Sequence, residues 1–439
     1  MPENRCETLL TCRWLLPVAP QNRVFENMAI AITGDQILAV GKADAIVKNW
    51  RADNTVELNH HAVLPGLINA HGHAAMTLLR GMAEDKPLQA WLKETIWPVE
   101  RAHMSEEFVR DGTRLAIAEM LSHGTTTFAD MYFFPEVAAD LADQIGMRAQ
   151  IAFPIMDFAN AWSDDVSECF HKGLSLRDRY KNHARVVVGF GPHSAYTVKQ
   201  ADLQQILIYA EEIDAPIQIH LHENAEEVAE AQKRVGRSWI TYLNDLGLLT
   251  RRLQAVHMTC TTPDELDLIS ATGVSVVHCP RSNLKLSSGA CSITDMQDRS
   301  INVALGTDGA ASNNSLDMFG EMRLAALLAK HQTGRADAGQ VAMILHMATL
   351  GGATALGIDA HTGSIEAGKA ADLVAVDLSG LAFAPVYDPM VQIIHGNSGN
   401  AVTDVWVAGR RLIADGRHQS LDLAETIARA NQWGGLIRP

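Results

Sequence analysis

The chain has 439 residues, 47% hydrophobic and 20% charged, which is typical of a globular protein with a large core. Its 36 basic and 51 acidic residues give a net charge of −15, which argues against binding to nucleic acid or an anionic membrane surface. The N-terminal segment carries charges and lacks a long apolar run, and no segment approaches the length of a membrane span, so we expect neither a signal peptide nor a membrane anchor.

Residues 1–61 lack a long helical pattern and contain turn-punctuated β patterns such as "MAIAITGDQILAVG". Residues 362–418 show the same kind of pattern, as in "AVTDVWVAGRRLIADG", before a stretch that predicts a terminal helix, "SLDLAETIARANQW". We therefore expect the flanks, 1–61 and 362–439, to form one small β-sandwich built from both chain ends, followed by that helix.

Between the flanks, residues 62–361 repeat one theme: a short apolar run, a polar end and then a helical stretch. Eight near-continuous apolar runs predict buried parallel strands; they cover 62–70, 124–131, 148–156, 185–193, 216–222, 253–258, 274–280 and 302–308. Helical patterns follow several of them, at 105–122, 199–213, 224–235, 263–271 and 317–331. The alternation predicts an α/β fold with a (β/α)8 barrel. The alternative is a doubly wound open sheet, but its glycine-rich phosphate loop is missing after the first strand.

The predicted strands end in an unusual number of polar side chains. In a (β/α)8 barrel the carboxyl ends of the strands form the active site, so we expect these side chains to converge on one face. They are His71 and His73 after the first strand, His193 after the fourth, His220, His222 and Glu223 after the fifth, His257, His278 and Asp308 after the last three.

This set matches the ligands of a catalytic zinc, which takes imidazole nitrogen and carboxylate oxygen and keeps one position open for water. Residues i and i+2 of a strand share a face, so His71 and His73 can point together into the barrel mouth. Asp308 can add an oxygen. A third nitrogen comes from His220 or His222, between which strand alternation does not choose.

Glu223 can reach the same pocket without binding the metal and serve as a general acid and base. A two-metal site would need a bridging carboxylate, often from a modified lysine at the end of the fourth strand. That strand ends in "GFGPHSAYT", without Lys, Asp or Glu. A single metal is therefore expected.

The motifs, taken in order, resemble those of the amidohydrolase superfamily over nearly the whole chain. They are "PGLINAHGH", "HGTTTFADM", "GFGPHSAYT", "HLHE", "VVHCPRSNLKL", "GTDGAASNN" and "GSIEAGKAADLVAVD". Within the superfamily, "LLRGMAEDKPLQAWL" together with "HLHE" most resembles the 5′-methylthioadenosine/S-adenosylhomocysteine deaminases.

The resemblance implies a barrel with a β-sandwich, one zinc ion per subunit and hydrolytic deamination of a 6-aminopurine nucleoside. It also implies a homo-oligomer. The six scattered cysteines form no CxxC pair, and in a long chain without a signal peptide we expect them to be free thiols in the cytoplasm. The implied metal ligands are His71, His73, His220 and Asp308, which favours His220 over His222. The implied catalytic residues are Glu223, His257 and Asp308.

For the substrate, the resemblance implies that Glu84 binds the ribose hydroxyls and that His193 contacts the nucleoside. Arg148 matches a basic residue that pairs with the carboxylate of S-adenosylhomocysteine. The loop over 157–168 carries four carboxylates and no Lys or Arg, so we expect an uncharged substituent such as methylthio at the 5′ position, against Phe133 or Trp162.

Three other functions compete with this interpretation. A deaminase or chlorohydrolase for another azine or purine base would keep the metal ligands and lose the use of Glu84. An amidase would usually show the missing two-metal pattern. A non-catalytic scaffold tends to lose ligands, whereas all four positions and Glu223 are present in this chain.

Overall fold

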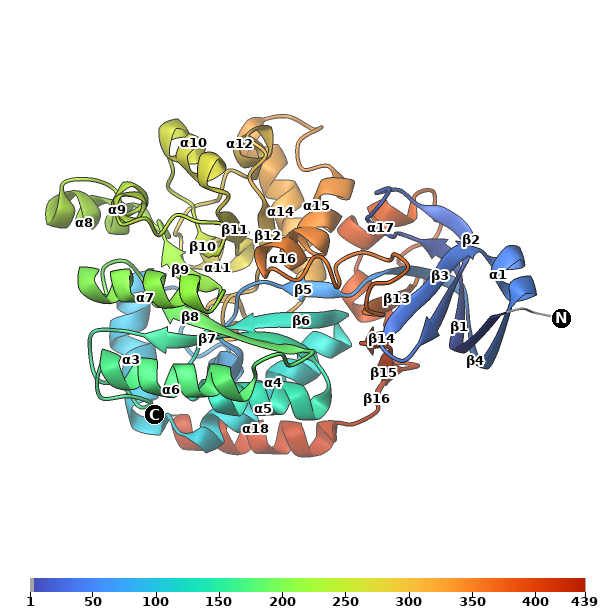
Figure 1. The fold of residues 1–439 in the computed structure, drawn as a ribbon, viewed down its shortest axis with the longest axis horizontal. Helices are drawn as coiled ribbons and strands as arrows, with labels where there is room; N and C mark the ends of the chain where they lie inside the picture. The colour runs from blue at the N-terminus through green and yellow to red at the C-terminus, as the bar shows by residue number, and fades with distance from the viewer. Residues whose placement is uncertain (1–3, 439) are drawn as a thin grey trace.

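The computed structural model describes residues 4–438 and contains two sheets of eight strands each (Figure 1). One sheet is parallel and runs in chain order from β5 to β12. Its strands are β5 (Leu67–Asn69), β6 (Thr125–Asp130), β7 (Arg148–Ile155), β8 (Val186–Pro192), β9 (Ile217–Leu221), β10 (Leu253–His257), β11 (Ser275–His278) and β12 (Val303–Leu305). The Ala70 amide donates to the Leu305 carbonyl at 2.9 Å and joins the last strand to the first. This closure confirms the predicted barrel and excludes the doubly wound sheet.

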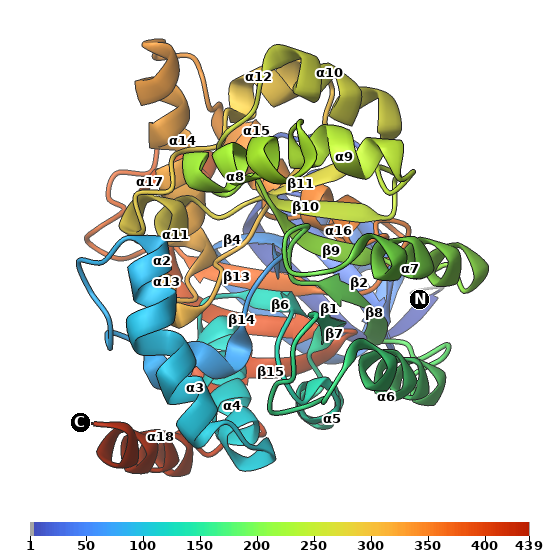
Figure 2. The same cartoon turned by 90° about the vertical axis from the view of Figure 1, so that its left-hand side faces the viewer.

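Helices surround the barrel (Figure 2). The five helical predictions are confirmed to within two residues by α4 (Glu106–Ser122), α7 (Gln200–Glu212), α8 (Ala225–Val235), α10 (Pro263–Thr272) and α14 (Met318–Thr333). Four of them begin where a polar side chain accepts a hydrogen bond from a backbone amide of the first turn, which satisfies a donor that the helix leaves unpaired. The capping residues are Ser105, Asn224, Thr262 and Asp317. Further helices on the barrel are α5 (Pro135–Ile145) and α6 (Val166–Arg179).

The second sheet combines both chain ends in the order β16-β15-β14-β13-β4-β1-β2-β3. Its strands are β1 (Asn4–Leu15), β2 (Phe25–Thr33), β3 (Gln36–Lys42), β4 (Trp50–Pro65), β13 (Leu373–Asp377), β14 (Val402–Val407), β15 (Arg410–Ala414) and β16 (Arg417–His418). The sheet curls around its own apolar core, to which Ile30, Leu58, Leu373 and Trp406 contribute. It lies to the right of the barrel in Figure 1, as a separate unit formed from the two flanks.

The single strand predicted over 62–70 is wrong: the structure divides it into two strands. Residues 62–65 end β4 and pair with β13 in the small sheet, whereas 67–69 form β5 of the barrel. Gly66 between them lies so close to Thr126 that a Cβ there would come within 2.1 Å of its Oγ1. The Gly66 amide donates to the Asp372 carbonyl at 2.9 Å, so the small sheet meets the barrel at the amino ends of its strands.

The predicted terminal helix is present as α18 (Leu423–Ile437), but it packs on the barrel. Its Trp433 stacks edge-on against Phe108 of α4, with ring centroids 5.3 Å apart. The indole Nε1 of Trp433 donates to Asp111 at 2.9 Å. All six cysteines are free thiols, as predicted. Among residues 4–438, no helix combines the length and apolar character needed to cross a membrane.

Candidate active site

Strand β9 and the segments that follow β5 and β12 bring four side chains together: His71, His73, His220 and Asp308. The Nε2 atoms of His71 and His220 are 3.2 Å apart. Asp308 Oδ1 lies 3.2 Å from Nε2 of His73 and 3.6 Å from Nε2 of His71. All four sequence-predicted metal ligands therefore point at one small volume at the carboxyl end of the barrel.

The neighbours of these histidines fix where their protons lie. Nδ1 of His73 lies 2.6 Å from the Met131 carbonyl, and Nδ1 of His220 lies 2.7 Å from the His193 carbonyl. A carbonyl only accepts, so both Nδ1 atoms carry a proton and both Nε2 atoms point at the centre. Nδ1 of His71 is likewise 2.7 Å from Gln218 Oε1.

This arrangement requires a positive charge at its centre. Two bare imidazole nitrogens 3.2 Å apart, those of His71 and His220, cannot hydrogen-bond to each other. Burial alone would lower the pKa of His73, but the hydrogen bond and the charge of Asp308 raise it to about 9, so the carboxylate favours a positive charge at Nε2 of His73, a proton in the metal-free protein and a metal ion in its place. Three nitrogen atoms and one carboxylate, with room for water, fit the zinc ion of a catalytic site.

Asp308 is held in place by its surroundings. The hydroxyl groups of Ser282 and Ser312 donate to its Oδ2 at 2.6 and 3.0 Å, and the Gly309 amide donates to Oδ1 at 2.8 Å. The residue has a φ of +60°, in the left-handed region, so the chain turns sharply directly after β12. The carboxylate is thereby directed at the histidines.

Glu223 follows β9 and lies beside this centre, with its Oε2 atom 3.8 Å from Nε2 of His257. Burial, followed by the charges of Asp308 and Glu227, raises its pKa well above the usual range. The backbone amides of His222 and Glu223 donate to the Glu227 carboxylate at 3.0 and 2.7 Å, which fixes the turn. Burial therefore favours the protonated form of Glu223.

His257 differs from the other three histidines in its hydrogen bonding. Its Nδ1 faces the Asn283 Nδ2 donor at 2.9 Å, so Nδ1 accepts and the proton lies on Nε2. The ring stacks on that of His220, with centroids 5.4 Å apart. His257 therefore presents an N–H donor toward the centre, which suits a group that orients an oxygen atom.

The centre opens into a pocket of about 830 Å³, a size suited to a nucleoside. His193, Glu223 and His257 line its floor, and Phe133 lines its wall as expected, whereas Trp162 does not. Most of the remaining wall is apolar or aromatic: Leu88, Trp91, Leu92, Ile96, Met104, Met156 and Phe158.

Three polar side chains of the pocket were missed by sequence reasoning. The Tyr132 hydroxyl donates to Glu100 at 2.5 Å, and burial raises the pKa of that carboxyl to about 7. Arg101 also lines the pocket. None of the three belongs to a motif with a recognisable spacing, because they come from a helix and a loop far apart in the sequence.

Glu84 lies outside this lining. Its Oε1 atom accepts hydrogen bonds from Lys285 Nζ and from Asn314 Nδ2, both at 2.8 Å. The side chain is 44% exposed. Glu84 is therefore a half-exposed carboxylate outside the pocket lining. One partner, Lys285, ends α11 (Pro280–Lys285), and the other, Asn314, follows α13 (Ala310–Asn313).

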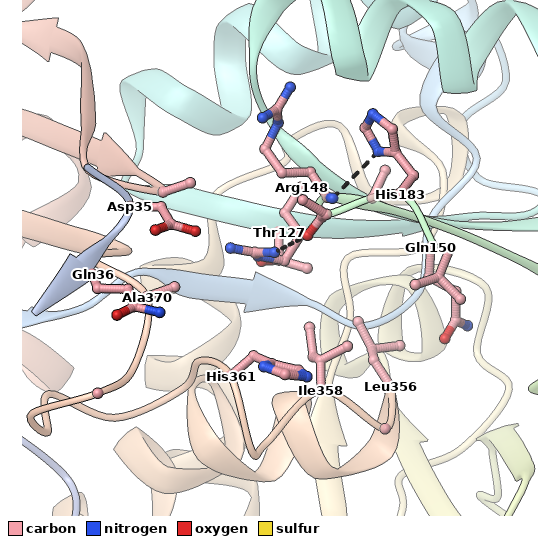
Figure 3. A pocket seen from close by; sticks show the side chains of 17 residues that line it. Asp35, Gln36, Thr127, Arg148, Gln150, His183, Leu356, Ile358, His361 and Ala370 are labelled. Atoms are coloured by element: carbon pink, nitrogen blue, oxygen red, sulfur yellow. Dashed lines mark hydrogen bonds between the residues drawn. The ribbon is translucent and has the colours of Figure 1, made fainter. Parts of the chain in front are cut away.

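The prediction that Arg148 binds substrate is wrong. Arg148 begins β7, so it lies at the amino end of the barrel, opposite the candidate site. Its guanidinium pairs with Asp372 at 3.0 Å and donates to the Ala184 carbonyl at 2.8 Å. Figure 3 shows it in a second pocket, between the barrel and Asp35 and Gln36 of the small sheet.

His222 and His278, whose roles the sequence left open, are both buried. Nδ1 of His222 lies 2.8 Å from the Cys260 carbonyl, so the ring points away from the metal ligands. Within the described part of the chain, Nε2 of His222 and Nδ1 of His278 have no hydrogen-bond partner.

A sequence model of the amidohydrolase family matches residues 62–412. A protein of Teredinibacter turnerae named 5-methylthioadenosine/S-adenosylhomocysteine deaminase is 47% identical, covering 97% of this chain and 96% of its own. A protein of the same name from Saccharophagus degradans is 44% identical, with the same coverage. A crystal structure of an adenosine deaminase from Xanthomonas campestris with bound zinc is 44% identical and superposes with a TM-score of 0.99 over 100% of both chains.

Proposed function

The chain belongs to the amidohydrolase family, and from this we propose that it is a zinc-dependent deaminase of 6-aminopurine nucleosides, with 5′-methylthioadenosine as its main substrate. The observation that carries the proposal is the convergence of three histidine Nε2 atoms and Asp308 beside Glu223, a buried acid with a raised pKa. The two deaminases from Teredinibacter turnerae and Saccharophagus degradans and the zinc-containing adenosine deaminase support it.

When bound, zinc supplies a water molecule activated for attack at neutral pH. Glu223 donates its proton to N1 of the purine, so negative charge does not build up on the ring when the oxygen adds to C6. The Nε2–H group of His257 orients that oxygen and stabilises its developing charge. Asp308 accepts the proton of the water and passes it to the departing ammonia.

The same geometry supports one zinc ion per subunit. In the described range 4–438, both groups of side chains able to hold a metal include His71, so they form one centre. The nucleoside is the proposed partner, bound by His193 in the pocket and by Glu84 from the rim. A homo-oligomer remains part of the proposal through the family resemblance, and a cytoplasmic location through the free cysteines.

The pocket wall favours a thioether at the 5′ position, because it is mostly apolar. The four carboxylates of the 157–168 loop do not line the pocket; one of them, Asp165, caps α6 instead. Arg101 is the feature that favours a second substrate, since a guanidinium can bind the carboxylate of S-adenosylhomocysteine.

The proposal is tested by following deamination of methylthioadenosine, S-adenosylhomocysteine and adenosine by absorbance, with zinc measured in the same preparation. We expect kcat/KM to be highest for methylthioadenosine. The substitution Arg101→Met should lower kcat/KM for S-adenosylhomocysteine alone. A higher kcat/KM for S-adenosylhomocysteine in the unmodified protein would overturn the substrate preference, and turnover of free bases only would overturn the nucleoside class.

A further inference from the structure

Three glutamine side chains form a hydrogen-bonded chain inside the barrel. They are Gln218 of β9, Gln254 of β10 and Gln150 of β7, each at most 3% exposed. Gln218 Nε2 donates to Gln254 Oε1 at 2.7 Å, and Gln254 and Gln150 exchange two hydrogen bonds of 2.8 and 3.0 Å. Figure 3 shows the far end of the chain, Gln150, at the edge of the pocket between the barrel and the small sheet.

The near end of the chain contacts a proposed metal ligand, and its amide orientation is fixed. Gln218 Nε2 also donates to the Ala70 carbonyl at 3.0 Å. A carbonyl only accepts, so the nitrogen of the amide must lie on that side. The amide oxygen therefore faces Nδ1 of His71, at 2.7 Å. An amide oxygen also only accepts, so His71 carries its proton on Nδ1 and leaves Nε2 bare.

His71 differs from the other two histidine ligands in the group that accepts its Nδ1 proton. The Nδ1–H groups of His73 and His220 donate to backbone carbonyls, which no substitution removes. The tautomer of His71 depends on the side chain of Gln218, which is held in turn by the hydrogen-bonded pair of Gln254 and Gln150. Without Gln218 Oε1, the proton of the neutral ring can occupy Nε2, where it competes with a metal ion.

We propose that Gln218 is a positioning residue which selects the metal-binding tautomer of His71, with Gln254 and Gln150 holding its amide in register. This inference rests on the proposed zinc site and adds a specific source of its affinity. Groups that orient a histidine ligand from behind typically contribute about 10- to 100-fold in metal affinity. The effect should diminish along the chain, because Gln218 stays anchored to Ala70 when the more distant links are lost.

The test uses one substitution at three positions: Gln218→Met, Gln254→Met and Gln150→Met. Methionine has a similar length and no amide, so each variant removes one link and leaves comparable unpaired groups behind. Zinc affinity is measured by competition with a chelator, and the absorption spectrum of the cobalt-substituted protein reports the ligand geometry. Urea unfolding of the metal-free proteins measures the structural cost.

We expect about 10- to 100-fold weaker zinc binding and an altered cobalt spectrum for Gln218→Met, a smaller loss for Gln254→Met and native values for Gln150→Met. Stability should fall in all three variants. Zinc affinity within twofold of the unmodified protein in Gln218→Met, or equal losses in all three variants, would overturn the inference. Failure of the proposed function has a different signature: zinc binding would be weak in the unmodified protein and unchanged by His71→Ala.

Discussion

Proton placement at individual residues distinguishes ligands from acid–base groups in this site. His71, His73 and His220 donate from Nδ1 and direct Nε2 at the centre, whereas His257 accepts at Nδ1 and presents Nε2–H. Burial is the main cause of the raised pKa of Glu223. The surroundings of each side chain determine its protonation. A substitution that changes only hydrogen bonding should therefore separate metal binding from turnover.

Glu223→Gln is the direct test of such a separation. The amide has the shape of the acid but no acidic proton to transfer to N1, so kcat should fall about 10²- to 10⁴-fold. Zinc content should stay at the level of the unmodified protein, because the Glu223 side chain is not among the ligands. Measured loss of zinc from the variant would show that Glu223 binds the metal.

Glu84 offers a second test at this scale. If it turns from Lys285 and Asn314 to the ribose hydroxyls, Glu84→Gln should raise KM for the nucleoside about 10-fold or more, since hydrogen bonds to a charged group are worth roughly 1.5–3 kcal/mol. We expect kcat to change little. Lys285→Met is the control, because it frees the carboxylate and should leave KM the same or lower. An unchanged KM in Glu84→Gln would show that Glu84 does not bind the ribose hydroxyls.

At the scale of whole elements, α14 braces the turn that carries Asp308. Glu321 of α14 is fully buried and accepts hydrogen bonds from Asn313 Nδ2 at 2.8 Å and from the Arg281 amide at 3.1 Å. Burial raises the pKa of this carboxyl from 4.5 to about 7. The folded protein therefore binds this proton more tightly than the unfolded chain does.

A defined pH dependence follows from Glu321. Its contribution to the free energy of unfolding is complete below about pH 4.5 and is lost as the pH rises toward about 7, by at most about 1.4 kcal/mol per pH unit. Glu321→Gln cannot titrate, so the difference in stability between the unmodified protein and the variant should shrink from pH 5 to pH 8. Urea unfolding of the metal-free proteins measures it. A stability difference that does not change with pH would contradict the raised pKa of Glu321.

The elements were largely predictable from sequence because their signals are local. Apolar runs and helical periodicity placed the strands and the five helices to within a few residues. The break at Gly66 between β4 and β5 was missed because both strands are apolar there and differ only in the strands with which they pair. Arg148 was misassigned because its role depends on lying at the start of β7. Gln218 was missed because a neutral amide carries no motif until the fold sets it against His71.

At the scale of the whole molecule, one buried ion pair joins the barrel to the small sheet. Asp372 accepts from Arg148, from the Thr362 hydroxyl at 2.8 Å and from the Ala408 amide at 2.6 Å. The Arg148 and Asp372 side chains are 9% and 0% exposed. A buried charge that loses its partner destabilises the folded protein, whereas replacing both charged residues by apolar ones is tolerated.

Asp372→Ala should accordingly lower the free energy of unfolding by about 3–5 kcal/mol, because Arg148 is left charged and unpaired. The double substitution Arg148→Met with Asp372→Ala should be less destabilised than the single one. Thermal or urea unfolding compares the two. A double variant that is less stable than the single variant would show that the charge of Arg148 is satisfied without Asp372.

The order of strands in the small sheet also constrains how the protein can be made. β4 is synthesised before the barrel, but its partner β13 is synthesised after it. During translation the edge of β4 therefore stays unpaired until nearly the whole chain has left the ribosome, and an open edge strand invites pairing with other chains. Truncation before β13 would leave that edge permanently open, so nascent and prematurely terminated chains should be the species that chaperones bind.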